Sequence, residues 1–187
     1  MTNDNIHVIL YDFDNFLALW YNGYKTVKDV NALFKIGDKV FYPNHGAGII
    51  KDIETKEVLG KEQEYYIISI PNMNMNIMVP KKNAEKIGLR HVVDRTTLKN
   101  AIKNARTNKE CLELPWKDRY KININKLKTG ELIETVEAYY DLALRSKEKT
   151  LNASEKQLLT KAQKYLISEI CIVEEISESE AEKYLVV

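Results

Sequence analysis

The spacing of apolar residues changes once along this chain, close to residue 94. Residues 34–93 hold short β-branched and aromatic runs separated by turn-forming residues, whereas residues 94–187 hold apolar residues three and four positions apart. Alternating side chains suit a strand, and a spacing of three and four suits a helix with 3.6 residues per turn. The change predicts an α+β protein of two domains, the first built from strands and the second all-α.

The strands expected within residues 34–93 follow each other too closely to leave room for crossover helices. Four or five short strands joined by tight turns predict an antiparallel β-barrel of the Tudor or SH3 type. In the segment PNHGAG, Gly46 and Gly48 are expected to supply the backbone freedom for a tight bend after Pro43. His45 is interpreted as a turn residue that is satisfied by local hydrogen bonds, and not as a catalytic base.

Capping residues mark the ends of the helices expected in the second domain. Asp94 is a predicted N-cap, and Gly130 is expected to stop a helix because glycine tolerates the left-handed conformation found there. The pairs Asn152–Glu155 and Ser177–Glu180 each form a capping-box pattern. The predicted helices cover residues 95–105, 117–128, 131–149, 152 to about 173, and a short last segment that begins at 177. They predict a compact helical bundle joined directly to the barrel.

Residues 1–33 follow neither pattern, and they are expected to be an N-terminal extension of unknown role. Asp12 and Asp14 form a DxD motif after a short apolar run, and paired carboxylates at the end of a strand can hold Mg²⁺. One alternative is therefore a metal-dependent phosphotransfer enzyme. The alternating strands and helices that such an enzyme needs do not follow in the next sixty residues. An extension that packs on the main body is the preferred interpretation.

Charge is unevenly distributed although the net charge is only +1. Residues 94–128 hold ten lysines and arginines against four acids, and residues 166–187 hold one lysine against six glutamates. A basic middle segment in a nearly neutral chain can hold an anion such as nucleic acid locally. The alternative is two solvated helix faces of opposite sign.

The features that enzymes, metal sites and membrane proteins require are missing from the sequence. Cys111 and Cys171 lie sixty residues apart with no CxxC motif, which argues against a zinc site or a disulfide framework and fits a reducing cytosol. No apolar run reaches transmembrane length and no signal peptide is evident, so a cytoplasmic protein without a membrane partner is expected. The motifs GxSxG, HExxH, GxGxxG and the P-loop are absent. We expect a binding protein with no cofactor or metal, and not an enzyme.

The segment LPWKDRYKINI, residues 114–124, places a tryptophan beside a run of charged residues. Two interpretations of Trp116 compete. Its ring is either part of the core, as it is for most tryptophans, or an exposed binding element next to the basic surface of Lys117, Arg119 and Lys121. The residues taken alone favour the core.

Several motifs in the same order make the chain resemble the CarD/CdnL family of bacterial RNA-polymerase-binding transcription regulators. The similarity extends from Phe34 to about Ile172. It is carried by the segments FKIGDKVFYPNHGAGIIKDIE, EYYIISIP, VPKKNAEKIGLRHVV, LPWKDRYKINI and SEKQLLTKA. The family usually begins near Phe34, so the resemblance explains nothing about residues 1–33.

The resemblance implies a monomeric regulator that stabilises the open promoter complex. Residues 34–93 would dock on the β subunit of RNA polymerase, and residues 94–187 would contact promoter DNA at the upstream edge of the melted bubble. In the family, the tryptophan at the position of Trp116 is a wedge against the minor groove, and the DNA contact is largely without base specificity. The DNA-binding candidates are Trp116, Lys117, Arg119, Lys121, Lys156 and Lys161.

Docking on the polymerase is expected to use an edge strand that pairs with a strand of the β subunit. The segment NMNMNIMVP, residues 72–80, is the predicted edge, and its methionines either offer an adaptable apolar contact or face the barrel core. Met78 stands where some relatives have arginine. The polymerase-binding candidates are Lys56, Met75, Ile77, Met78 and Pro80. The rival interpretation is a polymerase-binding module related to the transcription-repair coupling factor, without wedge activity.

Overall fold

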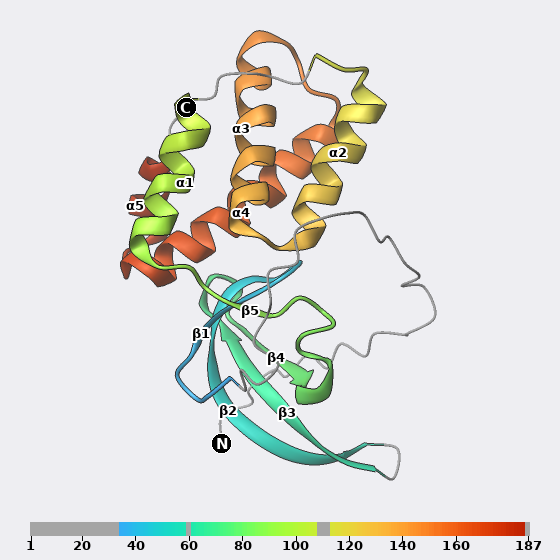
Figure 1. Cartoon of the computed structure of the whole chain (residues 1–187), viewed down its shortest axis with the longest axis vertical. Helices are drawn as coiled ribbons and strands as arrows, with labels where there is room; N and C mark the ends of the chain where they lie inside the picture. The colour runs from blue at the N-terminus through green and yellow to red at the C-terminus, as the bar shows by residue number, and fades with distance from the viewer. Residues whose placement is uncertain (1–33, 59–60, 108–112, 186–187) are drawn as a thin grey trace.

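A curved β-sheet and a bundle of helices occupy opposite ends of the computed structural model of this protein (Figure 1). The structure describes residues 34–58, 61–107 and 113–185. The phosphotransfer alternative, which depends on Asp12 and Asp14, lies outside the described residues, as do the rest of residues 1–33 and Cys111.

Five strands form one antiparallel sheet in the first domain. They are β1 (Lys39–Tyr42), β2 (Gly46–Val58), β3 (Lys61–Ile70), β4 (Met75–Pro80) and β5 (Arg90–His91). Their order in the sheet is β4-β3-β2-β1-β5, and every neighbouring pair is antiparallel. The 3₁₀ turns η2 (Pro71–Met73) and η3 (Lys81–Asn83) flank β4. This arrangement confirms the predicted Tudor-like fold.

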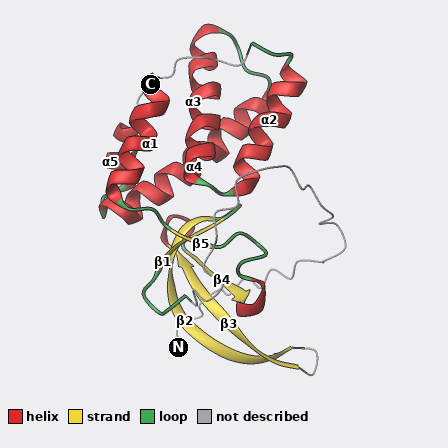
Figure 2. Ribbon diagram, viewed as in Figure 1, coloured by secondary structure: helices red, strands yellow, loops and turns green. Residues whose placement is uncertain are grey.

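Strands β2 and β3 form a long, strongly curved hairpin that extends away from the helices (Figure 2). A β-bulge interrupts their register between Ile50 and Asp52, and bulges increase the local twist of a strand. The curvature lets one face of the sheet enclose a core of its own. That core is formed by Phe34, Val40, Tyr42, Ile50, Tyr66, Ile68, Ile70, Ile77, Val79, Ala84 and Leu89.

The five predicted helices are confirmed. They are α1 (Arg95–Thr107), α2 (Trp116–Thr129), α3 (Leu132–Glu148), α4 (Ala153–Glu174) and α5 (Glu178–Tyr184). The predicted caps form: the Asp94 carboxylate accepts hydrogen bonds from the N–H groups of Thr96 and Thr97, and Asn152 exchanges hydrogen bonds with Glu155. Gly130 ends α2 with φ of +72°.

Helix α4 is the centre of the second domain, because it packs on α1, α2, α3 and α5 and also on strand β2. The apolar faces expected from the helical spacing point inward. The residues of α1, α2 and α3 at this spacing that are buried in the core are Leu98, Ile102, Leu127, Leu132, Val136, Tyr139, Tyr140 and Ala143.

The segment PNHGAG joins the two domains in addition to turning the chain. Phe41 and Ala47, which lie on barrel strands, are part of the helical core, and the Ala47 N–H donates to Ser168 Oγ on α4 at 2.9 Å. A Cβ on Gly46 would lie 2.6 Å from the same oxygen, and Gly46 has φ of +93°. Gly46 is therefore required by the close approach of α4. Gly48 was also expected to form the bend, but it lies inside β2.

A buried ion pair also crosses the joint, the contact between the barrel and the helical bundle. Arg90 donates two hydrogen bonds to Glu169, of 2.7 and 2.9 Å, and a third from Nε to the Gly130 carbonyl at 2.8 Å. Its guanidinium lies 4.5 Å from the centroid of the Phe41 ring. The two charged side chains are only 12% and 2% exposed. These contacts fix the orientation of the barrel relative to the bundle.

Candidate nucleic-acid interface and edge strand

Trp116 is the first residue of α2, and its side chain lies on the surface. Pro115 precedes it as the N-cap residue, a position where the N–H that proline lacks is not needed. The tryptophan is 49% exposed. The interpretation of Trp116 as a core residue, which the residues alone favoured, is therefore wrong.

Arg119, three positions further along α2, lines a surface hollow together with Trp116 and is itself buried, at 2% exposure. Its Nε donates to Glu155 at 2.8 Å, its second terminal nitrogen also donates to Glu155, and its first donates to the Leu114 carbonyl at 2.7 Å. Glu155 is itself the capping-box residue of α4. Arg119 was predicted to contact DNA, but its guanidinium faces the protein interior. Arg119 is therefore not available to contact DNA, because leaving Glu155 would leave a buried charge without its partner.

The predicted lysines differ in their surroundings. Lys117, Lys121 and Lys156 are exposed, and the Lys117 Nζ lies 5.9 Å from the centroid of the Trp116 ring. Because residues 117 and 121 are four positions apart on α2, they share one face of that helix. These lysines remain candidates for contacts with phosphate.

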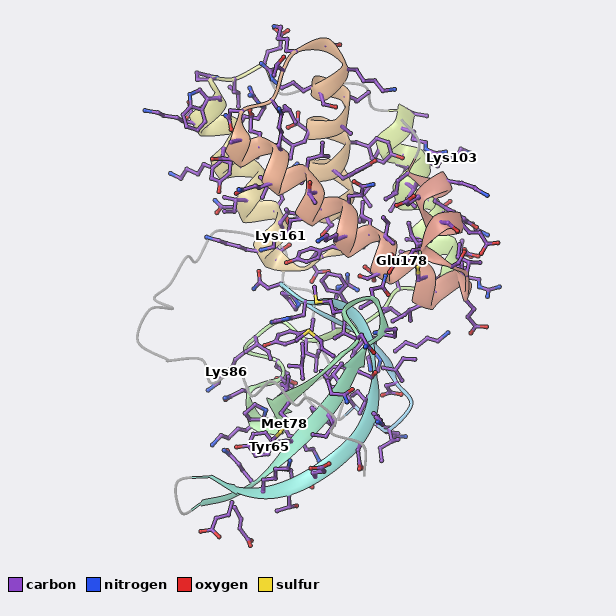
Figure 3. All side chains as sticks on the ribbon, turned by 180° about the vertical axis from the view of Figure 1, so that it is seen from behind. Tyr65, Met78, Lys86, Lys103, Lys161 and Glu178 are labelled. Carbon is purple, nitrogen blue, oxygen red and sulfur yellow. The ribbon has the colours of Figure 1, made fainter. Side chains whose placement is uncertain are left out.

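Lys161 lies further along α4, near the joint with the barrel (Figure 3). Its Nζ donates to the Asn44 side chain at 2.9 Å and lies 5.6 Å from the centroid of the Tyr165 ring. Burial, and then the charge of Lys128, lower the pKa of Lys161. The structure therefore places Lys161 in the interdomain contact and not beside Trp116.

A hollow of about 630 Å³ lies beside Trp116 and brings together residues that the sequence analysis did not single out. Arg145 and Lys149, at the end of α3, line it together with Trp116 and the first turn of α4. No sequence signal joins these segments, because they meet only in the folded bundle. The candidate site is consequently larger than the LPWKDRYKINI segment.

The acidic C-terminal segment lies against α1 and leaves α2 uncovered. Glu174 lies 3.3 Å from Lys99 and 3.9 Å from Arg95, and the Arg106 guanidinium donates to the Tyr184 carbonyl. Figure 1 shows α1 and α5 together on the side of the bundle away from α2. The basic segment that the sequence predicted is thus divided, because Arg95 and Lys99 in its α1 part lie near a carboxylate while Lys117 and Lys121 in its α2 part are exposed.

Within the described part of the chain, strand β4 pairs only with β3, so it forms one edge of the sheet, as predicted. Ile77 is 2% exposed and belongs to the barrel core, so its predicted contact with polymerase through the side chain is not supported. Met75 also packs against that core. Met78 and Pro80 are half-buried on the other face of the strand (Figure 3 shows Met78 beside Tyr65).

Lys56 shares that outer face. Its Nζ lies 3.6 Å from the Met78 sulfur and 2.9 Å from the Glu54 carboxylate. The two alternatives for the methionines of this strand, a core position and an exposed apolar contact, therefore each hold for one residue. Met75 faces the core, and Met78 lies on the outer face. The polymerase-binding candidates that remain available as side chains are Lys56, Met78 and Pro80.

His45 is a turn residue, as predicted, since its N–H donates to the Tyr42 carbonyl at 3.0 Å, but its side chain is not fully satisfied by hydrogen bonds. Its ring centroid lies 4.7 Å from that of Tyr42, and its buried Nε2 has no hydrogen-bond partner among the described residues. Burial, and then the nearby charge of Lys161, lower the pKa of His45. Both effects favour the neutral form of the ring.

The described part of the chain holds neither a cluster of metal ligands nor a membrane-spanning helix. Residues 34–58, 61–107 and 113–185 contain no group of three or more histidine, cysteine, aspartate or glutamate side chains placed to hold a metal ion. Over the same residues, no helix has both the length and the apolar character needed to cross a membrane.

Comparison with known proteins gives matches to both domains. Family models described as "CarD-like/TRCF RID domain" and "CarD, C-terminal domain" match residues 34–93 and 100–186. The putative transcription factor YdeB of Bacillus subtilis is 43% identical over 152 residues, which are 81% of this chain and 99% of that protein. The solution structure of the 72-residue N-terminal domain of Myxococcus xanthus CarD is 27% identical, with a TM-score of 0.29, and the match covers 37% of this chain and 93% of that one.

Proposed function

Because this chain belongs to the CarD/CdnL family, we propose that it is a transcription regulator that docks on the β subunit of RNA polymerase and stabilises the open promoter complex. The observation that carries the proposal is the position of Trp116, whose ring is exposed at the start of α2, the helix that the buried Arg119–Glu155 ion pair joins to α4. An exposed aromatic ring on a rigid base is suited to contact DNA at a fixed place.

The ring acts as a wedge at the upstream edge of the melted bubble. Inserting an apolar side chain between stacked bases costs about a few kcal/mol in intact duplex. At the bubble edge the stack is already interrupted, so Trp116 meets less resistance there than in closed DNA. Lys117, Lys121 and Lys156 contribute contacts with phosphate, which add affinity without reading bases.

Docking uses strand β4, an edge of the described sheet. Strand addition to this edge makes main-chain hydrogen bonds with a strand of the β subunit, while Lys56, Met78 and Pro80 contribute the side-chain contacts. Met78 offers a flexible apolar contact at a position where some relatives have arginine. The partner is therefore held by backbone pairing and apolar contact more than by an ion pair at this position.

The interdomain joint links the two contacts. Because Arg90, Glu169 and Gly46 fix the barrel on α4, docking at β4 determines where Trp116 meets the promoter. A regulator that binds the open complex better than the closed one shifts the population toward open. A preference of about 1.4 kcal/mol is enough for a tenfold change. The polymerase selects the promoter, and the chain acts as a monomer in the cytoplasm, associated with the nucleoid through the polymerase.

Two substitutions test the two halves of the proposal separately. Trp116→Ala is expected to bind a β-subunit fragment as the wild type does and to shorten the lifetime of open promoter complexes about tenfold, which corresponds to about 1.4 kcal/mol. Met78→Asp is expected to weaken binding to the β fragment. Ile133→Asp, a like change at a 60% exposed residue of the helical domain, is the matched control and should leave binding to the fragment unchanged.

The outcomes distinguish the alternatives. Full β-fragment binding with an unchanged open-complex lifetime for Trp116→Ala would assign the chain to polymerase-binding modules without a wedge, like that of the transcription-repair coupling factor. The family match gives no support to a phosphotransfer enzyme built on Asp12 and Asp14. A chain that lacks residues 1–33 is expected to keep both activities, and loss of a phosphatase activity with that segment would contradict the proposal.

A further inference from the structure

Three segments of the chain meet at the turn that contains Pro43 and Asn44. A Cβ on Gly130, which ends α2, would lie 2.7 Å from the Pro43 ring, so the end of α2 reaches this turn. From α4, Lys161 donates to the Asn44 side chain at 2.9 Å (Figure 3 labels Lys161). Both domains therefore contribute to one surface at the joint, and this surface lies at the opposite end of α2 from Trp116.

Lys128 and Lys161 bring two positive charges to this surface. Lys128 belongs to the last turn of α2, and its charge adds to burial in lowering the pKa of Lys161. Both lysines are exposed. Within residues 34–58, 61–107 and 113–185, no carboxylate forms an ion pair with either of them. The favourable effect of a cation near the C-terminus of a helix accounts for Lys128, but not for a second unpaired cation close to it.

The Asn44 side chain adds hydrogen-bond donors to the two cations. Its Oδ1 accepts from Lys161 Nζ at 2.9 Å and from the Tyr165 hydroxyl at 3.4 Å. Because an ammonium can only donate, the bond from Lys161 fixes the amide with its oxygen toward α4. Among the described residues, no acceptor bonds the Nδ2 group, which keeps two N–H donors. The surface thus combines donors and cations from both domains, which is the composition that an anion requires.

We propose that Lys128, Lys161 and Asn44 bind the phosphate groups of a small phosphorylated molecule at the joint. An ammonium binds phosphate oxygens as a point charge, and an amide N–H adds a neutral hydrogen bond. Two neighbouring cations match an anion with more than one negative charge, such as a pyrophosphate group, because the anion offsets their mutual repulsion. A small molecule fits better than DNA, because Lys161 is held in the interdomain contact by Asn44 and lies against the Tyr165 ring.

Binding at this surface stabilises one orientation of the two domains. Asn44 belongs to the barrel and the two lysines belong to the helical bundle, so the ligand is bound only where these side chains meet. A ligand that binds one arrangement of a protein stabilises that arrangement. The inference does not depend on the proposed function, since neither Trp116 nor β4 takes part in it. It adds a site at which a phosphorylated molecule strengthens the joint that links them.

The probe is inorganic pyrophosphate, added to the isotope-labelled full chain at constant ionic strength and followed by NMR. His45, next to Asn44 in the chain, reports binding at the joint. Burial, and then the charge of Lys161, lower the pKa of His45 in the free protein. A phosphate bound to Lys161 offsets that charge, so the pKa of His45 is expected to rise when pyrophosphate binds. The ring protons of His45, assigned with His45→Gln, measure this change, and the side-chain N–H signals of Asn44 are expected to shift in the same titration.

The double variant Lys128→Gln/Lys161→Gln is expected to bind pyrophosphate at least about tenfold more weakly, because both charged donors are lost. Lys128→Arg/Lys161→Arg keeps both charges and should retain most of the affinity. The matched control, Lys103→Gln/Lys183→Gln, removes two exposed lysines of α1 and α5, on the side of the bundle away from α2 (Figure 1). This control should bind pyrophosphate as the wild type does.

Two results would overturn the site. Equal affinities for the two glutamine double variants, with circular dichroism showing both folded, would mean that pyrophosphate responds to overall charge and not to the joint. If duplex DNA shifts the signals of His45 and Asn44 while pyrophosphate does not, the surface binds DNA and the small-molecule site is wrong. Either result leaves the proposed function in place, because that function is tested with Trp116→Ala and Met78→Asp.

Discussion

Arg90 on β5 and Glu169 on α4 form two hydrogen bonds across the joint between the barrel and the helical bundle, at 2.7 and 2.9 Å. An ion pair of this kind contributes modestly to stability, but removing one partner leaves a buried charge that water cannot reach. The pair therefore holds the domains in one orientation more than it strengthens either domain.

Glu169→Ala is expected to lower the free energy of unfolding by about 3–5 kcal/mol, because Arg90 is then buried without a partner. Urea denaturation followed by far-ultraviolet circular dichroism measures the change. Glu175→Ala is the matched control, since Glu175 joins Lys39 across the same joint but both side chains are exposed. The control should change stability little, and equal losses for the two variants would contradict the role given to burial.

Gly46→Ala is expected to destabilise the protein more than Gly37→Ala. Both glycines have positive φ, +93° and +91°, so the cost of holding alanine in this conformation is shared. Only at Gly46 does the added Cβ also meet Ser168 Oγ, at 2.6 Å, whereas nothing lies within 4 Å at Gly37. The difference between the two urea midpoints isolates the contact with α4, and a larger loss at Gly37 would be inconsistent with it.

Arg119→Ala and Lys117→Ala are expected to affect different properties, stability for the first and DNA binding for the second, although the two residues lie close together in LPWKDRYKINI. The first leaves Glu155 buried without its cation and should cost about 3–5 kcal/mol of stability. The second changes an exposed side chain and should leave stability nearly unchanged while weakening DNA binding. Urea denaturation measures the stability of both variants, and fluorescence anisotropy measures their DNA binding. An Arg119→Ala protein as stable as the wild type would contradict the burial of the Arg119–Glu155 ion pair.

Stability is expected to fall as the pH is lowered from 7.5 to 5.5, in part through His45. Burial and the charge of Lys161 lower the pKa of His45 in the folded state, below the 6.5 of the unfolded chain. Below pH 6.5 the unfolded state therefore binds more protons than the folded state, which destabilises the folded state. His45→Gln should show a smaller loss between these two pH values. An identical pH dependence in the variant would mean that His45 does not carry it.

Local features were predictable because they depend on residues close together in the chain. The capping pair Asn152–Glu155, the stop at Gly130 and the inward faces of the helices all follow from spacing and backbone preference. The edge at residues 72–80 was expected from the resemblance to the family, and β4 does form an edge of the sheet. The list of contact residues for that edge did not separate Met78, on the outer face, from Ile77, whose side chain fills the core.

Tertiary contacts decided the roles of the charged and aromatic residues. The residues next to Arg119 in the sequence do not indicate that it pairs with Glu155 in α4. The residues next to Trp116 likewise do not indicate that packing leaves its ring exposed.

By itself, then, the sequence determined two domains, their elements and the resemblance to a family, since periodicity and caps act over a few residues. Only the folded structure decided which cations face outward, where α4 meets the PNHGAG segment, and that Arg145 and Lys149 lie beside Trp116. Burial and pairing of charge depend on segments that the chain brings together from far apart, and no local pattern records them.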